Sequence, residues 1–161
     1  MKTNIILTII FLLIVFSLVS VSCKDSDSDT TKPVISLINP ADGEAIKIGG
    51  DMHLEMDLSD DVMLKSYMIE IHNNFDGHSH GNTRAAATEG PTVNFSFNKS
   101  YDLSGTKTAH IHQHDVVIPA NATPGQYHLM IYCTDASGNE TYVARKIVLS
   151  TTAEEHHITN H

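Results

Sequence analysis

Hydrophobic and polar residues alternate along most of the chain between Pro33 and Ser150, without a convincing helical repeat of apolar positions. A period of two is the pattern of a strand that buries one of its faces. Turn-forming stretches such as DASGN, which begins at Asp135, separate the alternating segments. The predicted strands are residues 34–38, 52–58, 64–72, 93–97, 108–118, 127–133 and 141–149. Seven short strands with turns between them predict an all-β fold, an antiparallel β-sandwich of immunoglobulin type over residues 33–150.

The N-terminal segment, residues 1–22, has a different pattern. Lys2 is followed by an apolar run and then by small residues that lead to Cys23. This is the pattern of a secretory signal peptide, and Cys23 stands where a bacterial lipobox has its lipid-modified cysteine, although Ser20 replaces the usual leucine. We therefore expect cleavage before Cys23, lipidation of that residue and a location at the cell envelope, anchored in the outer membrane. The apolar run is also nearly long enough for an uncleaved membrane anchor.

Two polar segments flank the predicted sandwich. Residues 23–32 are acidic and serine-rich, which predicts a disordered tether. Residues 151–161 are expected to be a flexible tail containing His156, His157 and His161. The formal net charge of −9 argues against nucleic acid as a partner. With Cys23 lipidated, Cys133 is the remaining cysteine, which excludes an intramolecular disulfide and favours a small buried side chain.

Several segments resemble the bacterial immunoglobulin-like modules of cell-envelope proteins, namely TKPVISLINPADG, LSDDVMLKSYMIEI and TPGQYHLMIYCTDASGNET. The histidine-containing stretches HNNFDGHSHG and HIHQHDVVIP, with IPANATPGQYH, are similar to an uncharacterised family of His-rich lipoproteins of Bacteroidetes type. The acidic tether after Cys23 resembles the export tethers of such lipoproteins. The resemblance implies the fold and the envelope location, and it brings no established activity with it.

Six of the eleven histidines lie in two short stretches, residues 72–80 and 110–114. Ordinary cores and surfaces seldom concentrate histidine in this way, so these stretches either bind a metal ion or are polar loops rich in one residue. Neutral imidazole is a ligand of zinc, copper, nickel and iron, whereas calcium and magnesium prefer oxygen. Zinc is therefore the expected cofactor, with copper or nickel as alternatives.

Parity along two strands brings histidines together. In the immunoglobulin strand order, strands 64–72 and 127–133 are antiparallel neighbours. Their apolar positions face the core, so His72 and His128 point outward at the same end of the sandwich. The loop that leaves this end contains His78 and His80.

The second stretch behaves less simply, because its histidines share the parity of the apolar residues that follow them in strand 108–118. A straight strand would turn three imidazoles toward the core, which is costly unless each is paired. Either a bulge near Asp115 switches the histidines to the other face, or the histidine end of the strand curls away from the core. Adjacent histidines lie about 6.6 Å apart along a strand and the outer two about 13 Å apart, so at most two of them can share one ion.

The predicted metal ligands are His72, His78, His80, His112, His114 and His128. Further candidates, as ligands or as hydrogen-bond partners of ligands, are His110, Asp76, Asp115 and Glu70. His53 is expected to be an exposed strand residue. Met52 and Met56 have the parity of the core, which favours packing over copper binding.

Three functions fit these features. The first is a lipid-anchored protein that captures or buffers zinc or a similar ion, with the lipid membrane, the metal ion and an envelope metal transporter as partners. Four or more histidine ligands suit binding, because catalytic zinc keeps one position open for water. The alternative is a structural or adhesive immunoglobulin-like module without a metal role. A metallohydrolase with Glu70 or Asp115 as base is the third, but HExxH and GxSxG motifs are absent, so we do not expect an enzyme.

Overall fold

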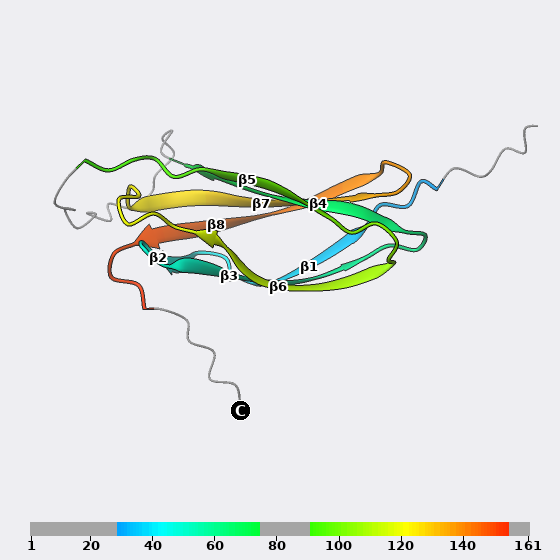
Figure 1. Ribbon diagram of the computed structural model, residues 1–161, viewed down its shortest axis with the longest axis horizontal. Coiled ribbons are helices and arrows are strands. Elements are labelled where there is room, and N and C mark those ends of the chain that lie inside the picture. The colour runs from blue at the N-terminus through cyan, green and yellow to red at the C-terminus, as the bar shows by residue number, and fades with distance from the viewer. Residues whose placement is uncertain (1–28, 75–90, 155–161) are drawn as a thin grey trace, which may run out of the picture.

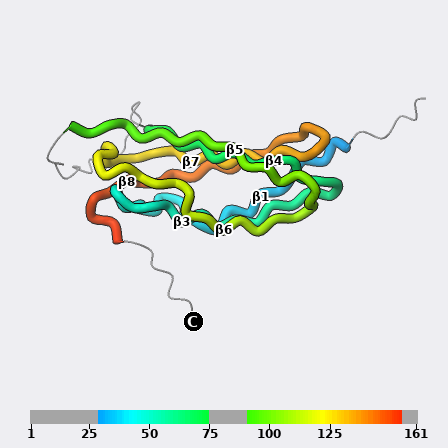
Figure 2. Tube along the Cα trace, viewed as in Figure 1, coloured from blue at the N-terminus to red at the C-terminus, as the bar shows by residue number. Residues whose placement is uncertain are grey.

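The computed structural model describes residues 29–74 and 91–154, and within these ranges the regular structure is entirely β. The strands are β1 (Val34–Asn39), β2 (Glu44–Lys47), β3 (Asp51–Ser59), β4 (Leu64–Asn73), β5 (Phe97–Asp102), β6 (Thr108–Val117), β7 (Gly125–Asp135) and β8 (Glu140–Ser150). They form a three-stranded sheet, β1-β3-β6, and a five-stranded sheet, β2-β8-β7-β4-β5. Figures 1 and 2 show the two sheets as two layers with their strands running along the long axis. The predicted all-β sandwich is confirmed.

The prediction of seven strands is wrong, because the structure contains an eighth. Strand β2 pairs in parallel with β8, whereas every other strand pairing is antiparallel. Its four residues are too few to display an alternating pattern in the sequence. Strand β2, which lies between the turn at Pro40 and the start of β3, therefore could not be recognised from the sequence pattern.

The predicted strand at residues 93–97 is also misplaced. Val93 makes only an isolated bridge with Ala122, and the regular strand β5 begins at Phe97. Strand β5 is at the edge of its sheet and pairs only with β4, so most of its residues are exposed. An edge strand with exposed polar residues lacks the apolar alternation by which the buried strands were recognised.

The core lies between the two sheets and is built from alternate residues of the long strands. In β3 the buried side chains are Met52, Leu54, Met56 and Leu58, each at most 1% exposed. Cys133 of β7 is fully buried as well. The expectation that these methionines and this cysteine are core residues is confirmed. Because the inner faces of the sheets are apolar, the polar residues of the same strands project from the two outer faces.

Within the described ranges, no helix has the length and hydropathy needed to span a bilayer. The predicted signal peptide, Cys23 and the histidines of the tail lie outside these ranges.

Candidate metal site

The outer face of β3 carries a row of ionisable residues. Asp51, His53, Glu55 and Asp57 alternate with the four buried apolar residues of the strand. This alternation follows from the strand period of two, since one face must be apolar to fill the core. The row therefore projects from the three-stranded sheet on the side away from the other layer.

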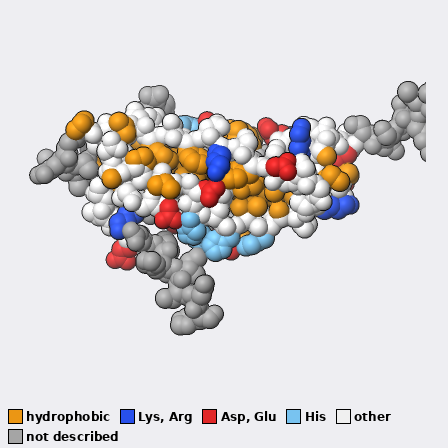
Figure 3. Space-filling view, in the orientation of Figure 1, with side chains coloured by type: hydrophobic (Ala, Val, Ile, Leu, Met, Phe, Trp, Pro, Cys, Tyr) orange, Lys and Arg blue, Asp and Glu red, His pale blue; other side chains and the backbone are white. Residues whose placement is uncertain are grey.

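Strand β6 places a second row beside the first. His110 faces Asp57 and His112 faces Glu55 across the antiparallel pair. The inward positions between them are occupied by Ala109 and Ile111, which pack against the core. Imidazoles and carboxylates therefore lie opposite one another on the outer face, and Figure 3 shows the histidines gathered on this side of the molecule.

A β-bulge keeps the histidines of β6 on the outer face. Leu54 pairs with Gln113 and Met52 pairs with Val116, so two residues of β6, His114 and Asp115, lie opposite the single residue between Met52 and Leu54. The extra residue reverses the parity of the strand, and Val116 is buried although it shares the sequence parity of the histidines. The predicted bulge near Asp115 is thus confirmed, and the alternative of a strand that curls away is wrong.

The bulge brings three imidazoles together, one from β3 and two from β6. One ring nitrogen from each of His53, His112 and His114 lies within 4.8 Å of the other two. The ring of His53 stacks on that of His114 with centroids 5.1 Å apart, and it lies 4.8 Å from the ring of His112. We call these residues the three-histidine site.

His53 is the least exposed member of this site. Its side chain is 11% exposed, and its Nε2 is buried and has no hydrogen-bond partner in the described part of the chain. The expectation that His53 is an exposed strand residue is therefore wrong, because the histidines of β6 cover its ring. Burial, and then the proximity of His112 and His114, lowers the pKa of His53, which keeps the imidazole neutral and its lone pair available.

Carboxylates orient the rings around this site. The Nδ1 of His114 lies 2.6 Å from Oδ2 of Asp51. If Nδ1 carries the proton and donates to Asp51, the lone pair of His114 is on Nε2, as in the carboxylate–histidine–zinc arrangements of metalloproteins. Asp51 therefore has the position of a residue that fixes the tautomer of a metal ligand.

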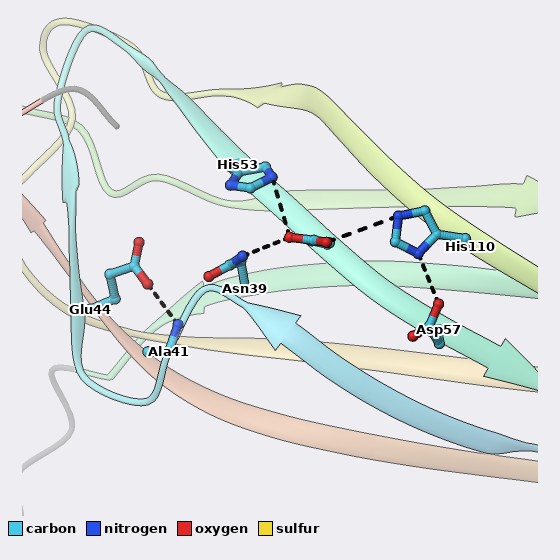
Figure 4. Close-up of polar contacts among 7 residues, drawn as sticks. Asn39, Ala41, Glu44, His53, Asp57 and His110 are labelled. Atoms are coloured by element: carbon cyan, nitrogen blue, oxygen red, sulfur yellow. Dashed lines mark hydrogen bonds and ion pairs between the residues drawn. The ribbon is translucent and has the colours of Figure 1, made fainter. Parts of the chain in front are cut away.

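Glu55 lies between His53 and His110 on the same face. Its Oε2 is 3.9 Å from Nε2 of His53 and accepts a hydrogen bond from Nδ2 of Asn39 at 2.9 Å, and its Oε1 is 4.0 Å from Nε2 of His110. Figure 4 labels His53, Asn39 and His110, and dashed lines mark their contacts with this carboxylate. His110 is held separately, with Nδ1 2.8 Å from Oδ1 of Asp57. Glu55 is thus the carboxylate near the site that offers a fourth ligand.

The donor set fits a transition metal. A tetrahedral zinc ion bound at about 2.0–2.1 Å holds its ligand nitrogens about 3.3 Å apart. The three nitrogens here are within 4.8 Å of one another, and the rings of His112 and His114 are exposed. The unpartnered nitrogen of His53 is a buried polar atom that a metal would satisfy. Three imidazoles, with Glu55 or water as the fourth ligand, would complete a tetrahedral zinc shell.

A second group of histidines lies on the outer face of the other sheet. His72 of β4 is directly opposite His128 of β7, with ring centroids 5.6 Å apart in an edge-on arrangement. Nδ1 of His72 is 3.3 Å from Oε1 of Glu70. The prediction that these two histidines lie side by side on an outer face is confirmed. Glu70 lies beside His72, as expected. We call His72 and His128 the histidine pair.

Other predicted site residues lie elsewhere. Asp115 is turned toward the neighbouring sheet, where its Oδ2 contacts Nζ of Lys99 at 3.0 Å and the hydroxyl of Tyr101 at 3.2 Å. Its side chain thus links β6 to β5. His112 and His114 belong to the three-histidine site, separate from the histidine pair. The loop residues His78, His80 and Asp76 lie outside the described ranges.

The sequence did contain a signal for His53. The immunoglobulin strand order that makes strands 64–72 and 127–133 neighbours also pairs strand 52–58 with strand 108–118. Applying the parity rule to this second pair places His53 on the outer face beside the histidines of β6. The register of the two strands, with Leu54 opposite Gln113 and Glu55 opposite His112, determines which two of those histidines it meets.

The histidines in the described ranges are therefore divided between two sheets, and the three-histidine site is the more complete constellation. None of the curated proteins compared with the chain matches it. The model of a domain of unknown function, DUF4625, matches residues 21–150, so the chain belongs to the DUF4625 family.

Proposed function

We propose that this protein binds a divalent transition metal, zinc foremost, through His53, His112 and His114, and that it captures or buffers this ion at the cell envelope. Copper and nickel are the alternative ions, because imidazole nitrogen also suits them. The observation that carries the proposal is the convergence of one ring nitrogen from each of these three histidines, together with the burial of His53 Nε2, which has no hydrogen-bond partner among the described residues.

The exposure of the site favours capture or buffering over a structural role for the metal. His112 and His114 are exposed, whereas the hydrophobic core is complete without an ion. A metal on this face contacts solvent, from which it can be loaded and to which it can be released. Transfer to an envelope metal transporter is the corresponding partner role.

We further propose that the fold is immunoglobulin-like and that the chain is a lipoprotein anchored through Cys23. The fold assignment is supported by the hydroxyl of Tyr127, which donates to the main-chain oxygen of Thr123 at 2.8 Å near the start of β7. This contact has the form of the tyrosine corner of immunoglobulin-type sandwiches. The anchor is supported by the signal-peptide pattern that ends at Cys23.

Elemental analysis tests the metal proposal. The full-length protein, purified without a histidine tag in mild detergent, is dialysed against limiting zinc, copper or nickel, and bound metal is counted per chain. We expect about one zinc ion per chain in the wild type and loss of this ion when His53, His112 and His114 are all changed to Ala. A double change of His72 and His128 to Ala serves as the matched control and should retain the ion.

Two outcomes would contradict the proposal. Equal loss of zinc in the triple variant and in the control would indicate loose chelation by scattered histidines. No stoichiometric uptake by the folded wild type would instead favour a structural or adhesive module.

A further inference from the structure

Three carboxylates meet where the chain enters the sandwich, away from the histidines. Asp29 precedes β1, and Asp60 and Asp61 lie in the loop between β3 and β4. One carboxylate oxygen from each lies within 4.8 Å of the other two. We call these residues the acidic edge. From His53 it is about 23 Å along β3 to Asp60, at the rise of an extended strand.

Two oxygens of the acidic edge are buried and unsatisfied. Oδ2 of Asp29 and Oδ2 of Asp60 are shielded from solvent and have no hydrogen-bond partner in the described part of the chain. Asp60 as a whole is only 8% exposed. Burying a carboxylate oxygen without a donor is costly, so this arrangement calls for a cation.

The surrounding contacts hold these oxygens in place and leave them without a donor. The other oxygen of Asp60, Oδ1, accepts from the main-chain N–H groups of Val62 at 2.9 Å and Met63 at 2.7 Å. These two bonds fix the orientation of the carboxylate. Nζ of Lys107 donates to the main-chain oxygen of Asp61 at 2.6 Å, so that ammonium group is engaged with a carbonyl.

The turn between β7 and β8 positions Asp29. Nδ2 of Asn139 donates to the main-chain oxygen of Asp29 at 3.0 Å and to Oδ2 of Asp135 at 2.7 Å. Because the same amide contacts both residues, the fully buried carboxylate of Asp135 lies near Asp29. Burial, and then the charges of Asp60 and Asp135, raises the pKa of the Cys133 thiol to about 11, in keeping with negative charge concentrated at this end of the core.

We propose that Asp29, Asp60 and Asp61 bind a calcium ion. The donors are all oxygens, which suits a hard cation, and calcium accepts six to eight oxygen ligands in flexible geometry, with main-chain carbonyls and water completing the shell. Magnesium demands near-ideal octahedral geometry and retains its water, and zinc prefers nitrogen or sulfur ligands. The ion fastens the segment that enters the sandwich to the loop between β3 and β4. This site does not depend on the three-histidine site.

Calcium-dependent thermal unfolding of the full-length protein in mild detergent tests this proposal. Calcium is titrated after treatment with a chelator, up to several millimolar, because extracellular modules bind it with dissociation constants of about 10⁻⁴–10⁻³ M. We expect calcium to raise the melting temperature of the wild type and magnesium to raise it much less. Direct calorimetric titration with calcium should give one ion per chain.

Asp60→Asn is the decisive variant. Asparagine retains the oxygen that accepts from Val62 and Met63, so the loop should fold, but it removes the charge that binds the ion. The calcium affinity should fall at least about tenfold, since affinity follows the ligand charge count. Asp57→Asn, an exposed acidic residue of β3, is the matched control and should keep the full response.

Two further measurements keep the test conclusive. Asp29→Asn repeats it from another segment and should also weaken calcium binding, whereas His112→Ala should leave the calcium response intact while it abolishes zinc binding. A wild type that does not respond to calcium, or that responds equally to magnesium, overturns the proposal. An unchanged calcium affinity in Asp60→Asn overturns it as well.

Discussion

The three-histidine site and the histidine pair are built on the same kind of surface and differ in what they can bind. Both lie on the outer face of a sheet, and both join histidines from neighbouring antiparallel strands. In the pair, one histidine faces one histidine. In the three-histidine site, one residue of β3 meets two residues of β6 that are two positions apart, and the bulge allows both to stay on the outer face while Val116 enters the core.

The comparison shows that a third ligand requires a specific neighbour. Two histidines that face each other across neighbouring strands offer two ligand nitrogens to an ion. The residue at the next outward position of either strand decides whether a third ligand can reach the same ion. On β6 that position is His112, opposite Glu55. On β7 the equivalent position is Met130, opposite Glu70. A methionine therefore stands beside the pair where the three-histidine site has a histidine.

Burial distinguishes one member of the three-histidine site, His53, from the pair, whereas His112 and His114 are exposed. The side chain of His53 is 11% exposed, whereas that of His72 is 46% exposed. Folding has already removed His53 from water, so metal binding at this ring carries little further desolvation cost. The pair remains hydrated and must lose that water when it binds an ion.

The largest expected difference is in zinc affinity after removal of one histidine from each group. His53→Ala should weaken zinc binding by more than about 100-fold, because loss of a direct ligand exceeds the 10–100-fold effect of removing its outer partner. His128→Ala should change the affinity less than about threefold, which is under 1 kcal/mol. Competition with a zinc indicator measures both variants, after circular dichroism has shown that they are folded. Similar losses of zinc affinity in the two variants would contradict the distinction between the three-histidine site and the histidine pair.

The next effect concerns the carboxylates that orient the rings. Asp51 and Asp57 make similar contacts, 2.6 Å to His114 and 2.8 Å to His110, but only His114 belongs to the three-histidine site. Asp51→Asn should reduce zinc affinity by about 10–100-fold, because the ligand loses its orienting acceptor. Asp57→Asn should leave the affinity nearly unchanged in the same titration. A larger loss in Asp57→Asn would mean that His110 is a ligand in place of His114.

A third histidine placed beside the pair should create a site there. In a His112→Ala background, which disables the native site, Met130→His adds an imidazole next to His128 and opposite Glu70. We expect zinc affinity to rise at least about tenfold, or about 1.4 kcal/mol, over the His112→Ala protein. Isothermal titration measures the gain, and a further His72→Ala change should remove it. A folded variant without any gain would show that the bulge, and not the number of histidines, makes the native site.

The smallest expected effect is on stability in the absence of metal. The pKa of His53 is lower in the folded state than in the unfolded state, where it is about 6.5. Between about pH 6.5 and the lower folded pKa, His53 is therefore protonated more in the unfolded protein than in the folded one. The free energy of unfolding therefore falls as the pH drops through this window. Urea unfolding with a chelator at pH 7.5 and pH 5.5 should show a smaller drop in His53→Gln than in the wild type. Equal drops in the two proteins would contradict the assigned cause.

The sequence alone predicted the features that follow from local pattern. The alternation in residues 52–58, 64–72 and 127–133 fixed which side chains face the core, so the buried methionines and the outward direction of His72 and His128 could be read directly. Strands β2 and β5 could not be read in this way. One is too short to alternate, and the other is an exposed edge strand.

The tertiary structure decided which of the outward residues meet. Strand pairing brings β3 beside β6, although the two are far apart in the sequence, and its register, with Leu54 opposite Gln113 and Glu55 opposite His112, places His53 against His112 and His114. A bulge is selected by the fit of the whole strand, because Val116 must enter the core while the histidines remain outside. Residue types and parity are local properties of the sequence, whereas register and the resulting ligand distances are properties of the packed sheets.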